Sequence, residues 1–104
     1  MSEMAVHNGV VYLAGQVVGD ASQDIAGQAK QVLAAIDALL ARVGSDKSKI
    51  LRAQIFIADL AEFAAMNAVW EAWVVPGHTP PRATVEARLA RPEWKIEIVV
   101  TAAV

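Results

Sequence analysis

The 104-residue sequence is short enough for one domain and long enough to build a hydrophobic core. Apolar residues make up 56% of it and charged residues 19%, which excludes an intrinsically disordered chain. The formal net charge is −2 and the basic residues are scattered, so we expect no nucleic-acid partner. The absence of cysteine excludes disulfides and cysteine-based metal sites.

The N-terminal residues lack the charged and apolar regions of a signal peptide, and no apolar run approaches the roughly 20 residues that span a bilayer. We therefore expect a cytoplasmic protein without a membrane partner. Mean hydropathy is +0.39, and three tryptophans are present in this short chain. Contact with further copies of the chain would bury this excess, although an alanine-rich helical core is an alternative explanation.

The first predicted elements are two strands at 3–7 and 10–17. Asn8-Gly9 between them is typical of a type I′ hairpin turn, in which both central residues have positive φ. A helix follows the polar cluster at 19–23, and Gly44 is predicted to end it. Its apolar residues recur at helical spacing: Ile25, Ala29, Val32, Leu33, Ile36, Leu39, Leu40 and Val43.

Residues 50–58 then predict a strand, and residues 59–62 resemble a capping box with Asp59 as the N-cap. A second amphipathic helix follows, and the proline-rich loop at 76–81 ends it. The apolar face of this helix consists of Phe63, Met66, Val69, Trp70, Trp73 and Val74. Two final strands are predicted at 82–89 and 95–103.

The predicted order ββαβαββ favours an α+β fold in one domain, residues 1–104, with both helices on one face of a sheet. Strand alternation predicts that Leu51, Ile55, Ile57, Val85, Leu89, Ile96, Ile98 and Val100 face the helices. The other face would carry Arg52, Gln54, Phe56, Arg82, Thr84, Glu86, Arg88, Lys95, Glu97, Val99 and Thr101. This mixture of charged and bulky apolar groups fits a face that meets another subunit and holds a polar pocket there.

Common catalytic and metal-binding motifs are absent, and His7 and His78 are predicted to lie in surface loops. Arg82 and Glu97, predicted on one sheet face, remain as candidates. One interpretation is a cross-strand ion pair worth about 0.2–1 kcal/mol. In the other, the planar guanidinium binds a carboxylate and the glutamate activates water, which suits hydrolysis of a small organic acid.

Asn67 lies among apolar helix positions, so it needs a hydrogen-bond partner there. A backbone partner within the helix packing and a place in a binding site are both open. Trp70 and Trp73 fit the apolar helix face and are interpreted as core or interface residues.

Four segments together resemble the RidA (YjgF-type) family of reactive-intermediate deaminases, and are most similar to its YoaB-type branch. They are residues 11–16 (VYLAGQ), 59–67 (DLAEFAAMN), 80–86 (PPRATVE) and 95–98 (KIEI). The resemblance implies a chorismate-mutase-like α+β fold with a mixed sheet. It also implies a homotrimer with a central barrel and three sites between subunits.

The implied activity is hydrolytic deamination of 2-imino acids and their enamine tautomers to 2-oxo acids and ammonia, as in a 2-iminobutanoate/2-iminopropanoate deaminase. No cofactor and no metal are implied, because a protonated imine is already a strong electrophile. Arg82 matches the arginine that binds the substrate carboxylate, and Glu97 matches the acid that positions the attacking water. Gly15 matches a glycine that lets backbone approach the ligand, Asn67 a pocket asparagine, and Thr84 a position with a small or thiol side chain.

Two departures from the family pattern concern substrate range and rate. The usual N-terminal segment with a pocket tyrosine has no counterpart in this sequence, and Ala14 replaces a serine. A non-catalytic trimer that binds small carboxylates, as a sensor or chaperone-like protein, is the alternative function. An endoribonuclease is a third interpretation, which the pI near 5.6 and the lack of a basic stripe disfavour.

Overall fold

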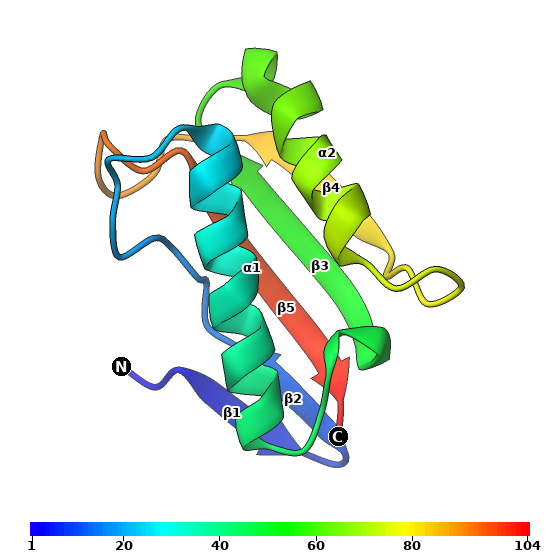
Figure 1. The fold of residues 1–104 in the computed structure, drawn as a ribbon. Helices are drawn as coiled ribbons and strands as arrows, with labels where there is room; N and C mark the ends of the chain where they lie inside the picture. The colour runs from blue at the N-terminus through cyan, green and yellow to red at the C-terminus, as the bar shows by residue number, and fades with distance from the viewer.

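The computed structural model describes all 104 residues as two helices on one face of a five-stranded sheet (Figure 1). The strands are β1 (Met4–His7), β2 (Val10–Leu13), β3 (Ile50–Ile57), β4 (Arg82–Glu86) and β5 (Ile96–Ala103). Their order across the sheet is β1-β2-β5-β3-β4, and only β3 and β4 pair in parallel. The predicted α+β architecture and mixed sheet are therefore confirmed.

The predicted hairpin joins β1 to β2. Asn8 and Gly9 both have positive φ, 51° and 75°, as the type I′ turn requires. The second strand ends at Leu13, earlier than predicted, and Gln16 then rejoins the sheet as an isolated bridge to Ile98. The chain thus leaves the regular sheet at Ala14 and Gly15, next to β5.

Helix α1 (Ile25–Arg42) has the predicted apolar stripe on its buried side. The Asp24 side chain caps it by accepting a hydrogen bond from the Gly27 N–H at 2.9 Å. Gly44, with a φ of 71°, follows the last turn as predicted. A short 3₁₀ turn, η1 (Lys47–Lys49), then leads into β3.

Helix α2 (Phe63–Trp73) is preceded by a 3₁₀ turn, η2 (Leu60–Glu62), so the predicted capping box is wrong in detail. Asp59 caps η2, accepting from the Ala61 N–H at 2.9 Å. Glu62 makes no capping bond to α2 and instead lies 3.5 Å from the Lys95 ammonium. Asp59 therefore caps the short 3₁₀ turn, and Glu62 forms an ion pair with Lys95.

The hydrophobic core lies between the helices and the sheet. Alternate residues of the two central strands face it: Ala53, Ile55 and Ile57 of β3, and Ile96, Ile98, Val100 and Ala102 of β5. The predictions for Leu51 and Val85 are wrong, because these side chains are 49% and 45% exposed. Leu51 falls at a register shift in β3, and Val85 pairs with Phe56, whose side chain points away from the helices.

The phase of β4 is opposite to the prediction. Arg82, Thr84 and Glu86 pair with the core residues Ala53, Ile55 and Ile57, so their side chains lie on the helix side of the sheet. The strand ends at Glu86, and Arg88, Leu89 and Lys95 fall outside the strands. The prediction that the polar residues of this strand face away from the helices is therefore wrong at this edge of the sheet.

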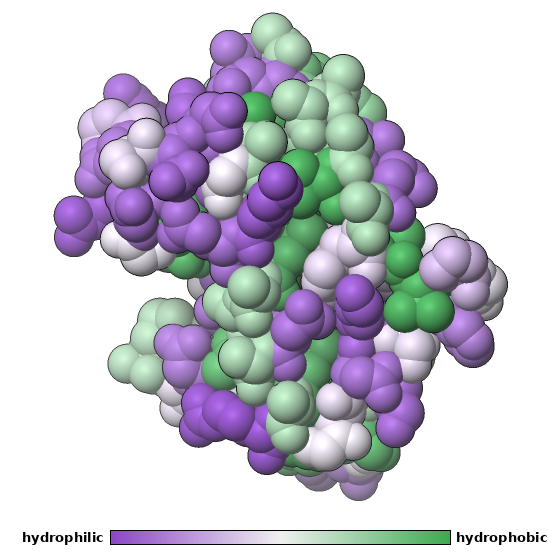
Figure 2. Space-filling view, viewed as in Figure 1, coloured by the Kyte–Doolittle hydropathy of each residue, from purple (hydrophilic) through white to green (hydrophobic).

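The face without helices, hereafter the open face, carries the remaining predicted mixture of residues. Arg52, Gln54, Phe56, Glu97, Val99 and Thr101 alternate with the core residues there, and Tyr12 pairs with Thr101. Seen from the helix side, apolar residues lie along the seam between α1 and α2, and polar residues gather over the loops around residues 17–24 and 87–95 (Figure 2). Neither helix combines the length and apolarity that crossing a membrane requires.

Candidate functional site

Arg82 is the first residue of β4, directly after Pro80 and Pro81. Its half-buried side chain extends toward α2, where Nη1 donates a hydrogen bond to Oδ1 of Asn67 at 2.8 Å. The guanidinium carbon lies 5.2 Å from the ring centre of Trp70 and 5.7 Å from that of Phe63. Helix α2 therefore fixes the position of this arginine from the side of the core.

No carboxylate pairs with Arg82. The two ion pairs of the chain lie elsewhere, between Arg91 and Glu93 and between Lys95 and Glu62. Withdrawing a guanidinium from water without an anionic partner is unfavourable, and its planar N–H groups suit a carboxylate or phosphate. A partly buried, unpaired arginine is thus a candidate anion-binding group.

The bond to Asn67 determines how its amide is oriented. A guanidinium has donors only, so the carbonyl oxygen of Asn67 must face Arg82 and the amide nitrogen must point away. That nitrogen makes no hydrogen bond within the chain. The two side chains present donors and no acceptor to a ligand, which favours an anion; the predicted alternative of a backbone partner for Asn67 is wrong.

Thr84 lies two residues along the strand, on the same side of the sheet as Arg82. Its Oγ1 is buried and has no hydrogen-bond partner, the only such side-chain atom in the chain. Residues two apart on a strand are about 6–7 Å apart. Arg82, Asn67 and Thr84 therefore form one group, which we call the arginine half of the site.

Glu97 and Gly15 form a second group on the open face, which we call the glutamate half. Glu97 pairs with Phe56, whose side chain points away from the helices. Its carboxylate packs over Gly15 so closely that a Cβ built there would lie 2.3 Å from Oε2. Gly15 is thus required by proximity to the carboxylate, since its φ is not in the left-handed region.

The prediction that Arg82 and Glu97 share a sheet face is wrong. Arg82 pairs with Ala53 on the helix side, whereas Glu97 projects from the open face. The reversed phase of β4 is the physical reason. The sheet separates the two side chains within one chain, so the predicted cross-strand ion pair is also wrong.

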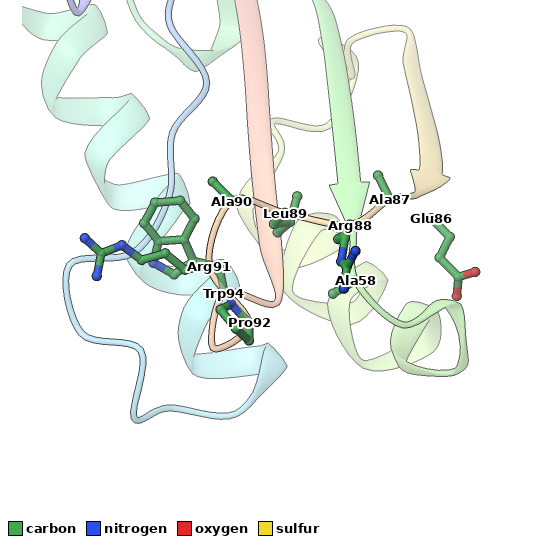
Figure 3. Close-up of a pocket in the computed structure, with 9 residues that line it drawn as sticks. All are labelled: Ala58, Glu86, Ala87, Arg88, Leu89, Ala90, Arg91, Pro92 and Trp94. Atoms are coloured by element: carbon green, nitrogen blue, oxygen red, sulfur yellow. The ribbon is translucent and has the colours of Figure 1, made fainter.

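The surface hollows do not unite the two halves. The largest, about 620 Å³, lies along the loop that follows β4 and contains none of the five predicted site residues (Figure 3). There Arg91 lies over the Trp94 ring at 5.5 Å, and Arg88 and Glu86 complete the polar lining. Arg82 borders a smaller hollow of about 330 Å³ at the start of β3 and β4.

The structure contains no group of three or more His, Asp or Glu side chains close enough to hold a metal ion. His78 is exposed in the loop before β4, as predicted. His7 is also exposed but ends β1, so its placement in a loop was wrong.

Gln28 is a residue that the sequence predictions do not include. Its polar side chain within the apolar stripe of α1 is the signal that could have identified it. It is fully buried, and its amide nitrogen donates to the carbonyls of Ala21, Gln23 and Glu93. Its Oε1 accepts from the Lys95 N–H at 2.9 Å. Gln28 thereby holds the segment that leads into β5 and Glu97.

The fold and the two halves define a small α+β protein with a half-buried arginine, unpaired with any carboxylate, on an edge strand of its sheet. The chain belongs to the family whose model is described as Endoribonuclease L-PSP, which matches residues 1–104. The resemblance to the RidA (YjgF-type) family and its YoaB-type branch is thereby confirmed.

Individual relatives agree with this membership. The chain is 52% identical over 103 residues to a RutC family protein of Haemophilus ducreyi, covering 99% of this chain and 88% of that one. It is 48% identical over 103 residues to the RutC family protein YoaB of Escherichia coli, covering 99% and 90%. A crystal structure of a YjgF family member from Neisseria meningitidis has a TM-score of 0.96 at 50% identity, covering 99% and 86%.

A more distant relative bears an enzymatic name. The chain is 33% identical over 82 residues to the 2-iminobutanoate/2-iminopropanoate deaminase of Escherichia coli, covering 77% of this chain and 64% of that protein.

Proposed function

We propose that this protein hydrolyses 2-imino acids, and the enamines that tautomerise to them, to 2-oxo acids and ammonia. The observation that carries the proposal is the unpaired Arg82 beside the Asn67 amide, whose nitrogen has no hydrogen-bond partner within the chain. These groups offer only hydrogen-bond donors, and a small 2-imino acid carries the carboxylate that such donors bind. The name of the distant deaminase relative supports the same substrate class.

Glu97 has the role of handling water in this proposal. The carboxylate accepts a proton as water adds to the carbon of the protonated imine, which gives a tetrahedral amino alcohol. Returning the proton to nitrogen lets the C–N bond break while the hydroxyl proton passes to the carboxylate and then to the departing ammonia, so that ammonium and the 2-oxo acid are released. Thr84 supplies a further hydroxyl beside the carboxylate-binding group.

The proposal requires a second copy of the chain. The arginine half and the glutamate half lie on opposite faces of one sheet, so a substrate that contacts both must sit between two subunits. The open face has apolar groups for such a contact, including Tyr12, which is 49% exposed. We propose the homotrimer predicted above, with the arginine half of each subunit against the glutamate half of the next.

A coupled assay tests the activity. An amino-acid oxidase generates the imine, and release of 2-oxo acid is followed with and without the protein, after subtraction of spontaneous hydrolysis. Arg82→Lys keeps the charge but loses the planar fork, at a cost of about 2–5 kcal/mol, so turnover and binding of pyruvate both fall. Glu97→Gln lowers turnover by about 10²–10⁴-fold while pyruvate binding survives.

Matched controls are available on exposed surfaces: Arg42→Lys at the end of α1 and Glu71→Gln on α2 are expected to keep the wild-type rate. A folded Glu97→Gln protein with wild-type turnover would contradict the role of Glu97. Wild-type protein that binds pyruvate without accelerating imine hydrolysis would favour the carboxylate-binding alternative.

RNA cleavage is the function that the name of the family model suggests. The net charge of −2 and the absence of a basic stripe disfavour it, since phosphate contacts supply most non-specific affinity for nucleic acid. Cleavage of RNA that Arg82→Ala leaves unchanged would point to a contaminant.

A further inference from the structure

One face of helix α2 surrounds the Arg82 guanidinium. Phe63, Asn67 and Trp70 are spaced at i, i+4 and i+7, so their side chains lie on the same side of the helix. All three contact the guanidinium: Asn67 through a hydrogen bond of 2.8 Å, and the rings of Phe63 and Trp70 at 5.7 and 5.2 Å. Both ring distances fall within the roughly 6 Å at which a cation and an aromatic ring attract each other.

The two rings and the hydrogen bond act on different parts of the guanidinium. An aromatic ring stabilises the cation over its own π-face and does not occupy the guanidinium N–H groups as a carboxylate would. Only one nitrogen, Nη1, has a protein acceptor, the Asn67 carbonyl. The surrounding residues thus compensate a partly buried charge while leaving N–H groups available to an incoming anion.

A long arginine side chain loses rotamer freedom when it binds a ligand, and this loss weakens binding. A side chain that the protein already holds in place avoids most of that cost. Arg82 stands on an edge strand, with a paired strand on one side only, so α2 is the element that can restrain it. Trp70 is suited to this role because it is itself fixed in the core, with 4% of its surface exposed.

We infer that Phe63 and Trp70 are positioning residues for substrate binding, which hold the guanidinium of Arg82 ready for a carboxylate and determine the affinity for it. The inference rests on the carboxylate-binding role proposed for Arg82. It extends that role to two aromatic side chains that the sequence placed on the apolar face of the helix, as packing residues of the core or an interface. It also makes Trp70 an intrinsic reporter of ligand binding, because a carboxylate on Arg82 would change the charge beside the indole.

The test measures the dissociation constant of pyruvate by calorimetry in ring-deleting and ring-keeping variants. Trp70→Leu and Phe63→Leu are each expected to weaken binding by about 5- to 30-fold. Trp70→Phe keeps a ring and restores most of the affinity. In the imine assay, KM rises in the leucine variants while kcat is largely retained, as for an interaction made equally in the ground and transition states.

Trp73→Leu is the matched control. Trp73 lies on the same helix and packs against Trp70, with the ring centres 5.5 Å apart, but the Arg82 guanidinium lies over the rings of Phe63 and Trp70 and not over that of Trp73. The Trp73 indole nitrogen donates to Asp37 at 3.0 Å, and its ring lies under Lys47. Its removal is expected to leave the affinity for pyruvate unchanged. If Trp70→Leu fails to fold, Phe63→Leu carries the test, because Phe63 is only half-buried.

Fluorescence gives a second measurement in a protein with Trp70 as its only tryptophan. The chain has three tryptophans, so Trp73→Phe with Trp94→Phe achieves this. Pyruvate is expected to change the emission in a saturable way, and Arg82→Lys to abolish the change. Wild-type affinity for pyruvate in both leucine variants would overturn this inference alone. A wild-type protein that binds no pyruvate and hydrolyses no imine would overturn the proposed function as well.

Discussion

Mixing two inactive variants tests whether the catalytic site is shared between chains. Arg82→Ala removes the arginine half of a site, and Glu97→Gln disables the glutamate half. The two residues project from opposite faces of one sheet, so an intact site in the mixture needs one chain of each kind. Equal amounts of the two proteins are unfolded together, refolded and assayed for imine hydrolysis beside wild-type protein treated in the same way.

The expected gain follows from counting. The chain that supplies Arg82 must be the Glu97→Gln protein, and its neighbour that supplies Glu97 must be the Arg82→Ala protein. Each condition holds for half of the chains, so random assembly restores about one quarter of wild-type turnover. Because each variant alone is expected to fall by about 10²-fold or more, this gain is easily measured.

A second mixture provides the control. Gly15→Ala and Glu97→Gln both damage the glutamate half, since Gly15 lies directly under the Glu97 carboxylate. Their mixture should gain nothing over the separate proteins. If the first mixture is no more active than its components, although refolding restores wild-type oligomers and activity, the site does not combine Arg82 of one chain with Glu97 of another.

The remaining predictions concern three substitutions, the oligomeric state and metal dependence. Gly15→Ala should fold with a near-wild-type melting temperature by circular dichroism, because the flexible end of Glu97 can yield, yet lose on the order of 10²-fold in turnover. Gln28→Leu should lower the free energy of unfolding in urea by about 1–3 kcal/mol, because it removes the hydrogen bonds that join the fully buried Gln28 amide to the backbone of Ala21, Gln23, Glu93 and Lys95. Hydrogen bonds from the Ser48 hydroxyl and N–H lower the pKa of Asp46, so the stabilising effect of this carboxylate is present at neutral pH and lost as the pH falls through the lowered pKa. The free energy of unfolding of Asp46→Asn, measured as a function of pH, should therefore lie below that of wild type at neutral pH and approach it at low pH. Light scattering should give a mass three times the 11.1 kDa of the chain, with activity that survives dialysis against EDTA; a monomer, or activity restored only by added zinc, would contradict these expectations.

Local signals in the sequence predicted the elements that depend on local chemistry. Asn8-Gly9 determines the hairpin because both residues accept positive φ, and Gly44 ends α1 for the same reason. The buried stripe of α1 could be predicted from the helical spacing of its apolar residues alone, because these residues lie on one side of the helix. These features required no knowledge of distant residues.

The prediction of the candidate site depended on which face of the sheet Arg82 and Thr84 occupy. Alternation of residue types along β4 separates its residues into two sets but does not determine which set faces the helices. The strand offers Arg82, Thr84 and Glu86 on one side and small or apolar residues on the other, and the polar set was assigned outward. It faces inward because α2 and its preceding turn supply partners: Asn67 accepts from Arg82, and the Leu60 N–H donates to Glu86 at 2.9 Å. Asn67, a polar residue among apolar helix positions, was the one sequence signal that pointed to such a partner.

The hydrogen bonds of Gln28 to Glu93 and Lys95 determine where the loop before β5 tolerates an insertion. A fluorophore or short peptide inserted among the exposed residues 90–92 would extend from the loop and leave those bonds intact. The same insertion between Glu93 and Lys95 would separate two backbone groups that one buried amide holds together. A label meant to report on Glu97 therefore belongs before Glu93, because beyond that point it would displace the residue that it is meant to observe.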